Sequence, residues 1–155
     1  MDKPMTDTTD RIEKHVDLKA PVEKVWRALT DHQQFGEWFG VKLEGPFAVG
    51  ETARGHITHA GYEHVRFESP VVAMEPMRRF AFNWRPHAVE PDRDYSNEPH
   101  TLVEFTLEPT ATGTRLVVVE SGFDAIPADR RQAAFHGNSG GWAEQMENIR
   151  AYVEP

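Results

Sequence analysis

The sequence contains no cysteine, so disulfide bonds, thiolate metal ligands and cysteine nucleophiles are excluded. It also lacks any apolar run near the roughly 18 residues that a membrane-spanning helix needs. Basic residues are in the minority, since 17 Lys and Arg stand against 25 Asp and Glu. Nucleic acids and anionic membranes attract basic surfaces, so we expect neither as a partner. The N-terminus is polar and acidic rather than signal-like, and we expect a soluble cytoplasmic protein.

The residues that are present are typical of a single folded domain. Hydrophobic residues make up 39% and aromatic residues 10% of 155 positions, which is enough for one core. The first ten residues are polar and show no periodicity. We therefore predict a disordered tail over residues 1–10, followed by one domain over residues 11–155.

The last stretch, residues 128–153, predicts a long amphipathic helix. Pro127 suits the first turn of a helix, because its fixed φ is already helical. Apolar side chains then recur at helical spacing: Phe135, Trp142, Met146, Ile149 and Val153. Residues 137–141 (GNSGG) interrupt this pattern, and each glycine inside a helix costs about 1 kcal/mol. Two interpretations stay open: a continuous helix whose small, polar N-terminal half lines a cavity, or a break at Gly140-Gly141.

The residues before this helix predict an antiparallel sheet. Apolar residues alternate with polar ones, and brief turns separate the runs. The expected strands are residues 12–18, 42–47, 51–59, 63–74, 79–85, 101–107 and 115–121. Two short helices are expected after the first strand, the second begun by a capping box of Thr30 and Gln33. Only the last helix is long enough to cover the sheet, which indicates an α+β fold with the sheet wrapped around it.

One polar segment, residues 86–100, contains three prolines and no periodic pattern. Loops of this length in a compact domain are commonly functional lids or disordered segments. We predict that it borders or gates a cavity.

Several motifs across the chain resemble one known family. They are Ala20–Thr30 (APVEKVWRALT), Trp38-Phe39, Gly45-Pro46-Phe47, Phe82-Asn83-Trp84, Gly113–Leu116 (GTRL), Glu120–Phe123 (ESGF) and Gly141-Trp142. On these residues the chain resembles a bacterial member of the START-like, or SRPBCC, helix-grip superfamily. Within it, the chain is most similar to the branch named after the activator of Hsp90 ATPase homologue. The resemblance implies a hydrophobic cavity between the sheet and the C-terminal helix, but it implies no particular ligand.

Nine residues are candidates for binding a ligand in such a cavity. The aromatic candidates are Phe35, Trp38, Phe39, Phe82, Trp84 and Trp142, and the polar ones are Glu120, Asn138 and Ser139. Glu120 has the same strand parity as Leu116 and Val118, which points it inward, unless it lies at a rim and faces water. A carboxylate inside an apolar cavity must be paired, hydrated or protonated.

Two further patterns suggest chemistry that we do not assign. Residues 137–141 match the G-x-S-x-G nucleophile elbow, but that motif follows a strand and needs a later histidine, and His136 is the last one. Three histidines, His56, His59 and His64, lie close together in sequence. The first two fall on opposite faces of a strand, and no recognised ligand spacing is present. We expect no metal and no cofactor.

The predicted function is binding of a small hydrophobic or aromatic molecule in the cavity. Two alternatives stay open. One is a cyclase-like or hydrolase-like enzyme that uses the same cavity. The other is a stress-related, co-chaperone-like interaction protein, for which a chaperone partner is implied by the family resemblance alone.

Overall fold

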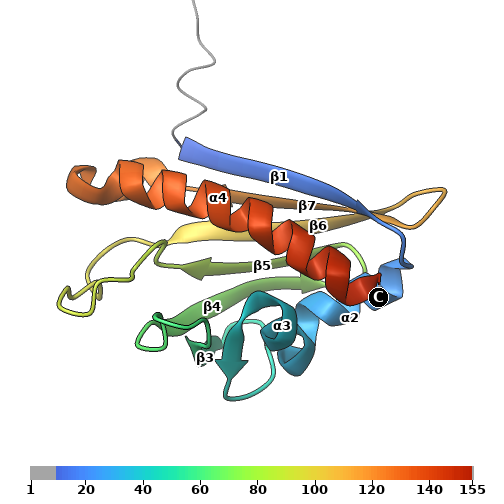
Figure 1. The fold of residues 1–155 in the computed structure, drawn as a ribbon, viewed down its shortest axis with the longest axis horizontal. Helices are drawn as coiled ribbons and strands as arrows, with labels where there is room; N and C mark the ends of the chain where they lie inside the picture. Colours follow the sequence, from blue (N-terminus) through green and yellow to red (C-terminus); the bar gives the residue numbers. More distant parts are fainter. Residues whose placement is uncertain (1–9, 155) are drawn as a thin grey trace, which may run out of the picture.

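The computed structural model describes residues 10–154 (Figure 1). The predicted tail lies outside these residues except for Asp10. The described residues form a seven-stranded antiparallel sheet in the order β1-β7-β6-β5-β4-β3-β2. Its strands are β1 (Arg11–Leu18), β2 (Val41–Leu43), β3 (Thr52–Ile57), β4 (Arg66–Glu75), β5 (Arg79–Trp84), β6 (Thr101–Pro109) and β7 (Thr114–Ser121).

Helices cover one face of this sheet. They are α2 (Val22–Thr30), α3 (His32–Phe39), the 3-10 turn η2 (Phe123–Ala125) and α4 (Ala128–Val153). The long helix α4 runs across the sheet, and α2 and α3 lie near its C-terminal end (Figure 1). The predicted α+β helix-grip architecture is confirmed.

The core lies between α4 and the inner face of the sheet. Burial alternates along β6 and β7, and their register places Phe105 opposite Val118 and Leu107 opposite Leu116. The predicted stripe of α4 covers these residues, with Trp142, Met146, Ile149 and Val153 buried. The inward side chains of the strands and the apolar stripe of α4 therefore pack together in one layer.

The helix α4 is continuous through Gly140 and Gly141, so the predicted alternative of a break there is wrong. A Cβ atom added to either glycine would meet nothing within 4 Å, so packing does not require glycine at these positions. Gly137 differs from both, because a Cβ there would lie 2.9 Å from ring atoms of His87. The loop after β5 therefore packs directly against the helix at Gly137.

The start of α3 differs from the sequence prediction. Asp31 is the N-cap, and its carboxylate accepts hydrogen bonds from the backbone N–H groups of Gln33 and Gln34 at 3.0 and 3.1 Å. Thr30 instead ends α2, where its hydroxyl donates to the carbonyl of Trp26 at 2.8 Å. The capping-box prediction was wrong because an aspartate one residue later is an equally good cap.

Candidate functional site

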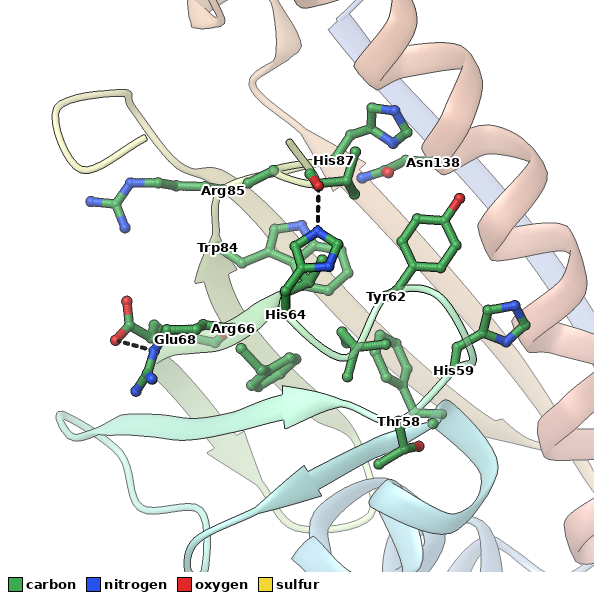
Figure 2. Close-up of a pocket in the computed structure, with 18 of the residues that line it drawn as sticks. Thr58, His59, Tyr62, His64, Arg66, Glu68, Trp84, Arg85, His87 and Asn138 are labelled. Carbon is green, nitrogen blue, oxygen red and sulfur yellow. Dashed lines mark hydrogen bonds and ion pairs between the residues drawn. The ribbon is translucent and has the colours of Figure 1, made fainter. Parts of the chain in front are cut away.

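A cavity of about 1170 Å³ lies between α4 and the β3–β4 side of the sheet. Its walls are α4, the end of α3, the β3–β4 hairpin and the loop after β5 (Figure 2). The cavity therefore forms where several loops and the C-terminal half of α4 come together.

Three aromatic rings form the inner wall, which we call the aromatic floor: Phe39, Phe67 and Trp84. Their centroids are 6.0 to 6.1 Å apart in each pairing, so all three rings contact one another. Phe67 is an inward residue of β4, Trp84 ends β5, and Phe39 ends α3 before the left-handed Gly40. Rings arranged in this way suit an apolar or aromatic ligand.

The carboxylate of Glu120 lies directly behind this floor and is completely buried. One of its oxygens accepts hydrogen bonds from Trp84 Nε1 at 2.7 Å and Thr101 Oγ1 at 2.5 Å. The other accepts from Asn138 Nδ2 at 2.9 Å and Trp142 Nε1 at 2.8 Å. Four donors offset the cost of burying the carboxylate. The inward interpretation of Glu120 is therefore confirmed, and the rim interpretation is wrong.

Of the nine predicted ligand-binding residues, the structure brings four to the cavity wall: Trp38, Phe39, Trp84 and Asn138. Four others are buried behind the wall and do not line it: Phe35, Phe82, Glu120 and Trp142. Ser139 is half-buried on α4 and is also absent from the wall.

The helix contributes to the cavity differently from our expectation. Of its small, polar N-terminal half, only Asn138 lines the wall. The C-terminal half supplies the remaining contacts: Glu144, Gln145, Asn148, Ala151 and Tyr152. The reason is that the apolar stripe of this half faces the sheet while an adjacent face of the same turns borders the cavity.

A buried arginine, Arg130, was not among the predicted site residues. It is only 8% exposed, and its Nη2 lies 2.6 Å from Oε1 of Glu98. Its Nη1 donates to the carbonyl of Pro86 at 2.9 Å. The guanidinium also lies over the ring of Tyr95, 4.8 Å from its centroid. Periodicity cannot reveal such a residue, because its partners lie more than 30 positions away.

A second arginine extends this network. Arg93 bridges Glu98 at 3.0 Å and Asp129 at 3.1 Å. The hydrogen bond from Arg93 lowers the pKa of Asp129 below its ordinary value. We call Arg93, Glu98, Asp129 and Arg130 the loop latch, because they fasten residues 86–98 to the first turn of α4.

Two histidines connect the same loop to its surroundings. His64, on the β3–β4 hairpin, donates from Nε2 to the carbonyl of Val89 at 2.7 Å (Figure 2). His87 has a left-handed backbone with φ of 53° and packs on Gly137. Burial, and secondarily the positive charge of Arg130, lowers the pKa of His87. Both histidines line the cavity, and so does His59.

Residues 137–141, which match the nucleophile-elbow pattern, lie inside α4. A nucleophile elbow requires a sharp turn between a strand and a helix. Ser139 therefore does not lie in a nucleophile elbow.

No helix within residues 10–154 combines the length and the apolar character needed to cross a bilayer.

Solved structures share this fold. A protein from Mesorhizobium loti is 28% identical, with a TM-score of 0.73 over 93% of this chain and 96% of that one. DynU16, from the dynemicin biosynthetic locus, is 26% identical with a TM-score of 0.72. The alignment covers 94% of this chain but 47% of DynU16, so this chain spans about half of its length. The Aha1 dimer of Colwellia psychrerythraea is 18% identical, with a TM-score of 0.70 over 93% of this chain and 96% of that one, which shows the fold alone.

No curated protein sequence matches the chain. A family model does match it, over residues 19–154, and that model describes the activator of Hsp90 ATPase homolog 1-like proteins. This match spans both short helices, the strands from β2 to β7 and the whole of α4. The chain therefore belongs to the activator of Hsp90 ATPase homolog 1-like family.

Proposed function

We propose that this protein binds a small hydrophobic or aromatic molecule in the cavity above the aromatic floor. The observation that carries the proposal is the cavity itself, about 1170 Å³ in volume with three contacting rings as its inner wall. Pockets that hold drug-sized ligands commonly measure about 300–1,000 Å³, so there is room for one such molecule.

The surroundings of Glu120 support binding rather than catalysis. All four of its hydrogen bonds come from side chains of the protein, and the carboxylate has no exposed area. A general acid or base must reach the proton it transfers. Glu120 instead holds Trp84 and Asn138, two residues of the cavity wall, in place.

The proposal is tested by filling the cavity. Ala151 lies on α4, is exposed and lines the wall, so Ala151→Trp places an indole in the ligand space. N-phenyl-1-naphthylamine, a neutral dye that brightens in apolar surroundings, serves as the probe. We expect Ala151→Trp to weaken its binding by about tenfold or more, which corresponds to about 1.4 kcal/mol.

Ala143→Trp is the matched control. Ala143 is exposed on the same helix but does not line the cavity. This variant should bind the dye as the wild type does. Absence of saturable binding to the wild type, or equal losses in both variants, would refute the proposal.

A further inference from the structure

Ser69 is a buried hydroxyl in the wall of the cavity. It lies on β4, where burial alternates so that Phe67, Ser69 and Val71 all face inward. The side chain has no exposed area, and its oxygen has no hydrogen-bond partner among residues 10–154. Buried polar groups nearly always find a partner, because leaving one unpaired lowers the stability of the fold.

Neither the cross-strand partner of Ser69 nor the side chains of the aromatic floor offer its hydroxyl a hydrogen bond. Across the sheet, Ser69 is opposite Ala53 of β3, whose methyl group can neither donate nor accept a hydrogen bond. Phe67, two residues earlier, belongs to the aromatic floor. The N–H of Trp84, which is the only polar group of that floor's side chains, donates to Glu120. Ser69 is thus a hydroxyl without a hydrogen-bond partner among the described residues. The aromatic surface next to it has no free donor or acceptor that could pair with it.

We propose that Ser69 selects the ligand: its hydroxyl pairs with one neutral hydrogen-bonding group on an aromatic ring lying against the floor. This inference rests on the proposed function. Ser69 lines the cavity, and a serine side chain has three staggered χ1 rotamers, one of which would have to direct the hydroxyl at the bound ring. A phenol or a ring carbonyl has the required chemistry.

The group must be neutral because of where Ser69 lies. One hydroxyl can satisfy one neutral donor or acceptor, but a buried ion needs an opposite charge or several hydrogen bonds. The favoured ligands are therefore neutral aromatic molecules with a hydroxyl or carbonyl substituent, rather than aromatic carboxylates or ammonium ions.

Two probes that differ in one group test this inference: 2-naphthol and 2-methylnaphthalene. They share the same two rings, and a methyl group replaces the hydroxyl. Equilibrium dialysis gives a dissociation constant for each. In Ser69→Ala we expect the ratio of the 2-naphthol constant to the 2-methylnaphthalene constant to rise about 3- to 10-fold, the effect of one neutral hydrogen bond. Binding of 2-methylnaphthalene should not change.

Ser121→Ala is the matched control, because Ser121 is half-buried on β7 and does not line the cavity. In Ser121→Ala the ratio of the 2-naphthol constant to the 2-methylnaphthalene constant should equal that of the wild type. Thermal unfolding of Ser69→Ala should show no loss of Tm, since no protein group loses a partner. A clear fall in Tm, or an unchanged ratio, would overturn the role of Ser69 and leave the cavity assignment standing. If neither naphthalene binds the wild type, the proposed function itself fails.

Discussion

At the scale of single residues, Glu120 joins four elements of the fold. Its carboxylate on β7 joins Trp84 of β5, Thr101 of β6, and both Asn138 and Trp142 of α4. Three of these four donors are N–H groups, which cannot accept a hydrogen bond in return. The arrangement therefore requires two acceptor oxygens at position 120.

Glu120→Gln tests this requirement. The amide of glutamine has one acceptor oxygen and one NH2 group, and each position of the carboxylate now faces an indole N–H. Whichever way the amide turns, one indole loses its acceptor. We expect the free energy of unfolding, measured by urea denaturation, to fall by about 1–3 kcal/mol. The loss should be larger if the hydrogen bonds to both indoles break.

Glu104→Gln is the control for that measurement. Glu104 lies on β6, is partly exposed and pairs with Arg79 at 2.6 Å. Ion pairs near the surface contribute little to stability. Glu104→Gln should therefore lower the free energy of unfolding by less than about 1 kcal/mol. Equal losses of unfolding free energy in the two variants would show that the fold does not require two acceptor oxygens at position 120.

His87 gives a prediction about pH. Because burial and Arg130 lower its pKa, the folded state favours the neutral ring more than the unfolded state does. The unfolded chain then binds more protons, so stability is lost as the pH falls through the ordinary histidine pKa of about 6.5. We expect His87→Gln to lose less stability than the wild type between about pH 7.5 and about pH 5.5.

The comparison uses urea midpoints at both pH values. His15→Gln, at an exposed position of β1, is the control and should follow the wild type. A wild-type pH dependence that survives unchanged in His87→Gln would contradict this account of His87.

Sequence reasoning reached the inward position of Glu120 because strand parity is strict. It did not reach the four donors, since they come from three other elements and lie 18 to 36 residues away. Arg130 was missed for a related reason. A charged residue is expected to be solvated, and the cost of burying Arg130 is offset by partners distant in sequence, Glu98 and the carbonyl of Pro86.

At the scale of elements, the loop over residues 86–100 was predicted to border or gate a cavity. It does line the cavity, while gating stays a prediction. The loop is fastened at its start by the bond from Arg130 to Pro86 and near its end by Glu98. Opening would therefore require the loop latch to break.

Arg130→Met removes the centre of the latch while keeping much of the side-chain volume. Glu98, whose side chain is 10% exposed, then keeps only Arg93 as an ionic partner. We expect faster amide hydrogen exchange over residues 86–98 and faster association and dissociation of N-phenyl-1-naphthylamine. Exchange within β6 and β7 should change less.

Arg131→Met is the matched control, because Arg131 is the neighbouring arginine and donates to Ile126 rather than to the loop. It should leave exchange over residues 86–98 unchanged. Unchanged exchange and unchanged probe kinetics in Arg130→Met would show that the latch does not control access to the cavity.

At the scale of the whole molecule, the fold was predictable because local patterns agreed with one another. Period-two strands, brief turns and one long amphipathic helix allow few arrangements other than a sheet gripping that helix. The position of the cavity was not predictable in the same way. It depends on the turn of the β3–β4 hairpin, the loop after β5 and the C-terminal half of α4 coming together, and neither the turn nor the loop has a periodic pattern.

Binding of a small apolar or aromatic molecule against the aromatic floor can be observed directly at Trp84, one of its three rings. The chain has four tryptophans, whose indole N–H resonances can be followed separately by NMR in 15N-labelled protein. Titration with N-phenyl-1-naphthylamine should shift the Trp84 resonance saturably, since Trp84 lines the cavity, and leave Trp26 of α2 in place. Saturable binding that moves Trp26 but not Trp84, or no saturable shift at all, would contradict the account.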